Sequence, residues 1–142
     1  MMIEKAGSAK WMGDLKTGKG LVSTESAALK DQPYGFNTRF EDGAGTNPEE
    51  LIGAAHASCF SMALSMILGE SDFVPEEIST TAKIYMDKKD GGFAVVKSQL
   101  TVAGKVPGAS EEDFMKAAEA AKENCPISKL LDCEITMTAT FA

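Results

Sequence analysis

The segment from Asn47 to Leu68 constrains the fold of this 142-residue chain more than any other part of its sequence. Asn47 is a good N-cap, Pro48 suits the first helical position, and Glu49 and Glu50 match the positive end of a helix dipole. A helix over this segment would be about 33 Å long. Past Glu50 it carries no charge and is apolar on nearly every side, so it must be covered all round.

A single chain of this length can cover only part of such a helix with one small sheet. Small residues along it would let a second helix approach closely: Gly53, Ala57, Ser58, Ser61 and Ala63. We therefore expect an intertwined homodimer in which two long central helices lie buried between sheets from both subunits. A monomer that wraps the helix with its own strands is the alternative.

The rest of the chain predicts an α+β fold with mainly antiparallel sheets, as a single domain over residues 1–142. Before the long helix, three short strands are expected at Ala9–Leu15, Gly20–Ser26 and Pro33–Phe40. After it come two alternating strands, Ile78–Met86 and Ala94–Val102, joined by a hairpin turn at Lys88–Gly92. A helix capped by Ser110 and Asp113, a short helix after Cys125 and a final strand, Glu134–Phe141, complete the chain.

Composition and charge narrow the class of protein. Apolar residues make up 44% and charged residues 25%, as in folded globular proteins. The net charge of −7 argues against nucleic acid or an anionic membrane as a partner. The sequence contains no run of 18 apolar residues, so we expect no transmembrane helix. The N-terminus shows no secretory signal, and the odd number of cysteines, three, favours a reducing, cytoplasmic compartment.

The sequence predicts neither a metal site nor a bound cofactor. With one histidine, and with cysteines 66 and 8 residues apart, the chain offers no set of zinc ligands. It contains no Cys-x-x-Cys motif and no nicotinamide or flavin fingerprint.

Cys59 lies in the middle of the expected long helix and has two possible roles. As an ordinary buried cysteine it would be a small hydrophobic residue, whereas a reactive thiol would have to ionise. Burial opposes ionisation, and a helix dipole acts only within the first turn, so a nearby cation would be needed.

Arg39 is the only arginine in the chain and the best candidate for that cation. Phe36 and Phe40 bracket it with apolar bulk, although the commoner role of a lone arginine is a surface charge on an edge strand. Lowering the pKa of a thiol by two units takes about 2.7 kcal/mol. A guanidinium about 4 Å away supplies roughly 4 kcal/mol at an effective dielectric constant of 20, so one close arginine would suffice.

The other two cysteines and the histidine are open to structural and chemical interpretations. Cys125 precedes Pro126 and could cap a short helix, or act as a resolving thiol that condenses with oxidised Cys59. Cys133 begins the last strand and is interpreted as structural. His56, one turn before Cys59, could be the general base of a Cys–His pair or fill a polar, partly buried position.

Two segments resemble the motifs of the OsmC/Ohr family, the osmotically inducible protein C and organic hydroperoxide resistance proteins. Thr46–Leu64 resembles the family's signature helix, and Asn124–Ser128 is similar to its second cysteine motif. Three further places resemble the OsmC branch in particular: His56 within Ala-Ala-His-Ala, Gln32–Phe40 and Ala9–Asp14. The resemblance covers nearly the whole chain.

The resemblance implies an activity and a set of site residues. Family members are thiol peroxidases that reduce organic hydroperoxides, and they are intertwined dimers with composite sites at the subunit interface. By position, Cys59 matches the peroxidatic cysteine, Cys125 the resolving cysteine, Arg39 the arginine that contacts the reactive thiol, and Glu49 the glutamate that orients this arginine. The implied reductant is an external dithiol of the lipoyl type.

Glu49 and Cys59 lie ten residues apart on the expected helix, about 15 Å along its axis. They cannot belong to one compact site within a single chain. Either Arg39 spans that distance, or Glu49 and Arg39 come from the second subunit, which is what the resemblance implies.

An apolar pocket at the thiol would favour alkyl or fatty hydroperoxides over hydrogen peroxide. Six side chains are candidates for its lining: Phe36, Phe40, His56, Phe60, Met62 and Met66. Two other functions fit the same residues, namely a redox-sensing or ligand-binding dimer that uses the disulfide as a switch, and a structural dimer with inert thiols.

Overall fold

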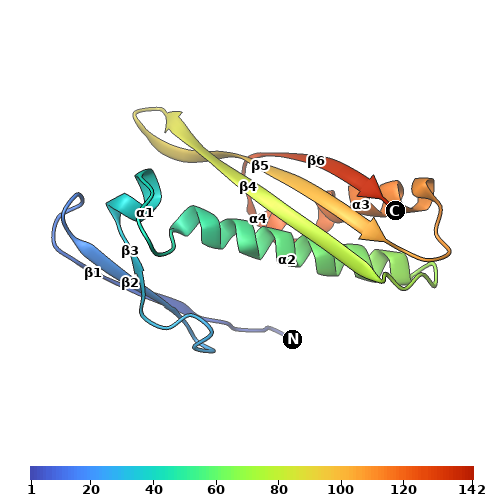
Figure 1. Cartoon of the computed structure of the whole chain (residues 1–142), viewed down its shortest axis with the longest axis horizontal. Helices are drawn as coiled ribbons and strands as arrows, with labels where there is room; N and C mark the ends of the chain where they lie inside the picture. The colour runs from blue at the N-terminus through green and yellow to red at the C-terminus, as the bar shows by residue number, and fades with distance from the viewer. The chain divides into compact units, whose positions relative to one another are not determined.

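A computed structural model describes residues 1–142 as two compact units, Met1–Leu51 and Ile52–Ala142. Each unit contains one three-stranded sheet, and helices are combined with both sheets (Figure 1). The predicted α+β class is therefore confirmed.

The first unit is an antiparallel sheet followed by a short helix. Its strands β1 (Gly7–Met12), β2 (Lys19–Thr24) and β3 (Gln32–Tyr34) pair in sequence order. They confirm the three expected strands, but the third is shorter than predicted.

The prediction of a strand over Pro33–Phe40 is wrong beyond Tyr34, because Phe36–Phe40 forms helix α1. The hydroxyl of Thr38 accepts the Gly35 N–H at 2.8 Å and donates to the Gly35 carbonyl at 3.0 Å. The Arg39 N–H also donates to that carbonyl. These local bonds turn the backbone out of the strand, so Arg39 lies on a helix and not on an edge strand.

The long helix is present as α2 (Pro48–Gly69), within one residue of its expected bounds. Asn47 caps it as predicted, since its side-chain oxygen accepts the Glu50 N–H at 2.8 Å. In the second unit, one stripe of α2 is buried: Gly53, His56, Phe60, Leu64 and Leu68.

The second unit holds the larger sheet. Strands β4 (Glu77–Lys89) and β5 (Gly92–Lys105) form the expected antiparallel hairpin. Its turn residues Asp90 and Gly91 have φ of 52° and 83°, the positive values that a type I′ turn requires.

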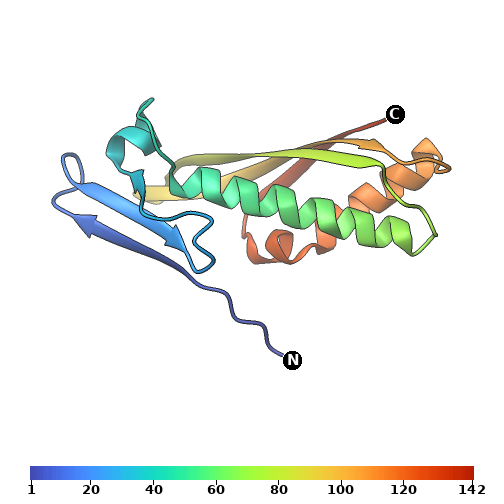
Figure 2. The same ribbon diagram turned by 60° about the horizontal axis from the view of Figure 1, so that its bottom comes forward.

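Helices α3 (Glu111–Asn124) and α4 (Pro126–Leu130) then lead to β6 (Glu134–Phe141). The predicted capping box at Ser110 and Asp113 is formed. Strand β6 pairs with β5 in parallel, because the two helices carry the chain back across the sheet. Figure 2 shows α2, α3 and α4 on the same face of this sheet.

The core of the second unit lies between that face and the helices. It is built from α2, β5 and α3, and its largest fully buried side chains include Phe60, Leu64, Leu100 and Phe114. The apolar stripe of α3 is buried: Phe114, Ala117, Ala118 and Ala121.

Helix α2 is long and apolar enough to cross a membrane, judged by length and composition alone. Its apolar stretch is not continuous in sequence, because glycine, histidine and serine interrupt it. Within one chain, 28% of its most apolar stretch is buried. Met62 and Met66 on its uncovered side are 76% and 66% exposed, so one chain leaves an apolar face of α2 open.

Candidate functional site

The thiols of Cys59 and Cys125 lie within hydrogen-bonding reach of each other in the second unit. Cys59 is half-buried in the middle of α2, and Cys125 is buried at the N-cap of α4. Neither takes part in a disulfide. Two residues 66 positions apart in sequence are thus brought together by the packing of α4 beside α2.

The Cys59 thiol is held in its protonated form by its surroundings within one chain. Burial is the main cause that raises its pKa, and the neighbouring Cys125 raises it further. The backbone N–H of Ile127, in the first turn of α4, opposes them by donating a hydrogen bond to the sulfur. Ionisation at neutral pH therefore needs positive charge beyond what this unit supplies.

The first turn of α4 positions Cys125. The Ser128 N–H donates to the Cys125 sulfur at 3.4 Å, so this cysteine caps the helix as the sequence suggested. The thiol in turn donates to the Ser128 hydroxyl oxygen at 3.1 Å. Pro126, at the first helical position, has no N–H that would need a partner.

His56 is completely buried and bonded on both sides. Its Nδ1 lies 2.7 Å from the Ser98 hydroxyl on β5, and its Nε2 lies 2.8 Å from the Ser128 hydroxyl on α4. Burial lowers the pKa of His56. Its hydrogen-bond partners are two serines, so the arrangement does not support a direct Cys59–His56 pair.

Cys133, which precedes β6, contacts the backbone of Ser98. Its sulfur accepts the Ser98 backbone N–H, and burial and the nearby Asp132 raise its pKa. A protonated, half-buried thiol fits the structural interpretation of Cys133.

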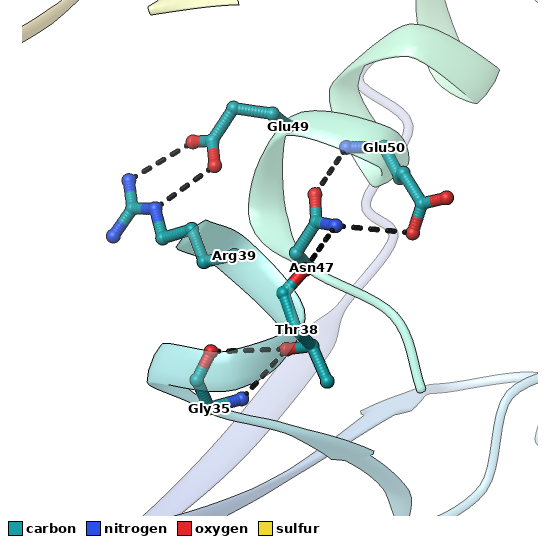
Figure 3. Close-up of polar contacts among 6 residues, drawn as sticks. All are labelled: Gly35, Thr38, Arg39, Asn47, Glu49 and Glu50. Carbon is teal, nitrogen blue, oxygen red and sulfur yellow. Dashed lines mark hydrogen bonds and ion pairs between the residues drawn. The ribbon is translucent and has the colours of Figure 1, made fainter. Parts of the chain in front are cut away.

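Arg39 and Glu49 form a bidentate ion pair in the first unit (Figure 3). Arg39 Nε and Nη2 donate to the two carboxylate oxygens of Glu49, each at 2.9 Å. The Glu49 side chain is only 15% exposed, whereas that of Arg39 is 37% exposed. The pair fixes the plane of the guanidinium, because both of its hydrogen bonds must stay aligned with the carboxylate.

Asn47 ties together the two helices that carry this pair. Its side-chain amide donates to the Thr38 carbonyl of α1 at 2.9 Å and to the Glu50 carboxylate at 3.1 Å (Figure 3). The same side chain caps α2. Arg39 and Glu49 are therefore held on elements that are bonded to each other.

An apolar cavity of about 290 Å³ lies beside Arg39 in the first unit. Aromatic side chains dominate its lining: Trp11, Tyr34, Phe36 and Phe40. The Phe36 and Phe40 rings contact each other, with centroids 4.8 Å apart, and the Arg39 guanidinium lies 5.7 Å from the Phe40 centroid. Two of the six lining candidates are thus at a cavity.

The other lining candidates have different positions. His56 and Phe60 are fully buried in the second unit, and Met62 and Met66 are exposed on α2. No group of three or more histidine, cysteine or acidic side chains is placed to hold a metal ion.

Sequence reasoning did not include Ser98 and Ser128 among the functional candidates. Ser128 carries a weak signal, because it stands three residues after a helix cap, where its N–H meets the capping group. Ser98 carries none, since it is one of many alternating strand residues and only the folded structure brings it to His56.

The chain matches the family model described as OsmC-like protein over residues 41–140. Peroxiredoxin OsmC of Escherichia coli is 57% identical over 137 residues, which cover 96% of each sequence. The organic hydroperoxide resistance protein OhrB of Bacillus subtilis is 34% identical over 111 residues, covering 78% of this chain and 79% of the relative.

Solved structures show the same fold. An OsmC-like protein of unknown function from Vibrio cholerae superimposes with a TM-score of 0.78 at 18% identity, over 97% of this chain and 99% of the other. The crystal structure of Bacillus subtilis OhrB gives a TM-score of 0.68 at 22% identity, over 96% and 98%.

Proposed function

The chain belongs to the OsmC-like family and is a peroxidase, and we propose that it reduces organic hydroperoxides to alcohols with Cys59 as the attacking thiol. The observation that carries this proposal is the placement of the Cys59 and Cys125 thiols side by side. A thiol that is oxidised by a peroxide needs a second thiol at this distance to form a disulfide. Relatives named as organic hydroperoxide resistance proteins support the substrate class.

The reaction cycle has three steps. The Cys59 thiolate attacks the distal peroxide oxygen, which carries the hydrogen; the O–O bond breaks, the alkoxide leaves and takes a proton, and Cys59 becomes a sulfenic acid. The Cys125 thiol then displaces water from that sulfenic acid and forms a disulfide. An external dithiol restores both thiols by two exchange reactions and leaves as its own disulfide.

The cation that ionises Cys59 is, in this proposal, Arg39 of a second copy of the chain. Arg39 is bonded to Glu49, and about 15 Å of helix separates Glu49 from Cys59. A guanidinium about 4 Å from the sulfur would supply roughly 4 kcal/mol at an effective dielectric constant of 20. That would offset the burial that raises the pKa of Cys59.

The open face of α2 supports a homodimer. Exposed apolar side chains, including Met62 and Met66, alternate there with small residues that permit close approach. A second α2 helix would cover this face, and burying one methionine side chain gains about 1.5–3 kcal/mol. The face also carries Ser58 and Ser65, which suit a packed protein interface better than lipid.

The family match crosses from the first unit into the second, so we propose that both units act as one OsmC-like domain over residues 1–142.

The cavity beside Arg39 supports substrates with an organic tail. The apolar lining favours binding of an alkyl or aryl group, which hydrogen peroxide lacks.

Three free thiols favour a reducing, cytoplasmic compartment, where a lipoyl-type dithiol could serve as the reductant. The chain itself offers no Cys-x-x-Cys motif for that task.

Consumption of tert-butyl hydroperoxide with excess dithiol tests the proposal. We expect Cys59→Ser to be inactive. Cys125→Ser should be oxidised once and then depend strongly on the external thiol. Cys133→Ser, the matched control, should retain most of the activity. Retention of most activity by Cys59→Ser would refute the assignment, and oxidation of the wild type without turnover would favour a redox sensor.

A further inference from the structure

A continuous chain of hydrogen bonds links the buried histidine to the second thiol. The Cys125 thiol donates to the Ser128 hydroxyl oxygen at 3.1 Å, and this hydroxyl lies 2.8 Å from His56 Nε2. On the far side, His56 Nδ1 lies 2.7 Å from the Ser98 hydroxyl. The four side chains come from three elements of one unit, so this order does not depend on a second copy.

The direction of the first bond fixes the others. Since the Ser128 oxygen receives the thiol proton, its own hydrogen is available to donate to His56 Nε2. The remaining proton of a neutral imidazole then sits on Nδ1 and is donated to Ser98. Both bonds between the sulfur and the histidine thus point toward the histidine, which is the arrangement that a proton relay needs.

We propose that Ser128 and His56 form a relay that removes the proton of Cys125 as this thiol attacks the Cys59 sulfenic acid. Ser128 contacts the reacting Cys125 sulfur directly, whereas His56 acts through Ser128 and is a positioning residue. The inference rests on the proposed peroxidase function and assigns a role to a histidine that the peroxide-reducing step does not use.

The step balances as follows. A bond forms between the Cys125 and Cys59 sulfurs while the S–O bond of the sulfenic acid breaks. The Cys125 sulfur is oxidised and the Cys59 sulfur is reduced. The thiol proton moves to the Ser128 oxygen as the Ser128 hydrogen moves to His56 Nε2. The departing hydroxide then takes a proton back through Ser128, so water is released and His56 is neutral again.

The surroundings of His56 suit a proton acceptor. Burial lowers its pKa, so the ring is neutral at neutral pH and Nε2 can accept. Two further thiols adjoin the relay, namely that of Cys59 beside Cys125 and that of Cys133, whose sulfur accepts the Ser98 N–H. The charged side chains of the adjoining segments, Lys129, Asp132 and Glu134, are exposed, and none perturbs His56. Lys97 of β5 is directed instead at the Tyr85 ring.

The test is a single turnover of the full-length protein with one equivalent of tert-butyl hydroperoxide at pH 6 to 9.5. A sulfenic-acid trap measures oxidation of Cys59, and the loss of titratable thiols measures disulfide formation. We expect Ser128→Ala to slow disulfide formation about 100-fold at pH 7. Oxidation of Cys59 should keep its wild-type rate. The defect should shrink toward pH 9.5, where thiols ionise without help.

Three further variants separate the relay from packing. Ser128→Thr keeps the hydroxyl and should largely restore the rate at pH 7. His56→Gln keeps polar contacts but cannot take up a proton, so it should show the same pH-dependent defect as Ser128→Ala. Ser61→Ala is the matched control, because Ser61 also bonds a second hydroxyl, that of Thr80, without contact to this chain.

Two results would overturn the relay. One is a wild-type rate of disulfide formation in Ser128→Ala at pH 7. The other is a defect of the same size at every pH, which would mean that Ser128 only holds the thiol in place. Failure of the proposed function looks different, because the wild type itself would then form no sulfenic acid at Cys59.

Discussion

Arg39 grips both carboxylate oxygens of Glu49, with two nitrogen–oxygen distances of 2.9 Å. The carboxylate comes from the first turn of α2 and the guanidinium from α1, and Asn47 bonds these two helices to each other. These contacts fix the orientation of the Arg39 guanidinium, although the arginine side chain is flexible by itself. In the proposed mechanism one cation must lie beside one sulfur, so this direction matters more than the stability that the pair adds.

Glu49→Gln should lower kcat/KM for tert-butyl hydroperoxide about 10- to 100-fold, because a misdirected guanidinium no longer lies close to the sulfur. Thermal stability should change little, since the pair is partly exposed. Glu50→Gln removes the same charge one residue on, from a carboxylate that bonds Asn47, and is the control. Equal activity of Glu49→Gln and wild type would remove the reason for assigning Glu49 to the site.

Gly104→Ala should destabilise the second unit by about 1–3 kcal/mol, because its new methyl group would overlap the Phe114 ring. Gly92 has open space around its Cα, so Gly92→Ala should shift the free energy of unfolding by less than about 0.5 kcal/mol. Urea unfolding of the two variants measures the difference. Similar midpoints would show that α3 can move away from β5 at little cost.

The unfolding free energy should fall as the pH drops below about 6.5, the ordinary value for histidine. Burial lowers the pKa of His56 in the folded state, so the unfolded chain binds its proton first, and stability present above that pH is lost below it. Because His56 is the only histidine, comparison of wild type and His56→Gln isolates the effect. Parallel stability curves for the two proteins from pH 5 to 7.5 would contradict it.

Local signals predicted most of the elements. Ser110 and Asp113 mark the start of α3, and the spacing of Phe114, Ala117, Ala118 and Ala121 identifies its buried face. Alternation did not distinguish a strand from α1, because the bonds between Thr38 and Gly35 that end β3 leave no trace in hydropathy. The parallel pairing of β6 with β5 could not be predicted either, since alternating hydropathy along a strand does not specify which strand it pairs with.

The candidate site was predictable only in part. Cys59, Cys125, Arg39 and Glu49 were identified by residue type and by resemblance to a family. The contact of His56 with Ser128 joins residues 72 positions apart, and sequence spacing on α2 suggested Cys59 as the neighbour of His56 instead. Side chains at i and i+3 lie near each other on a helix, but the partner is decided by what packs against it.

Mixing two inactive variants tests whether Arg39 acts across subunits. Cys59→Ser supplies an intact Arg39, and Arg39→Met supplies an intact Cys59, so a mixed dimer contains one complete composite site. We expect partial recovery of peroxidase activity after subunit exchange. The control is a mixture of Cys59→Ser with the variant that carries both Cys59→Ser and Arg39→Met, which should recover no activity. Absence of recovery in exchanged dimers would place Arg39 and Cys59 in the same chain.

The ionisation of Cys59 tests the account most directly. The rate at which iodoacetamide alkylates the Cys59 peptide, measured against pH in the native protein, gives the pKa of this thiol. We predict a value well below the ordinary 8.5 of cysteine, and a rise above it in Arg39→Met. A Cys59 thiol that stays protonated near pH 8 in the wild type, or that titrates identically in Arg39→Met, would contradict the account.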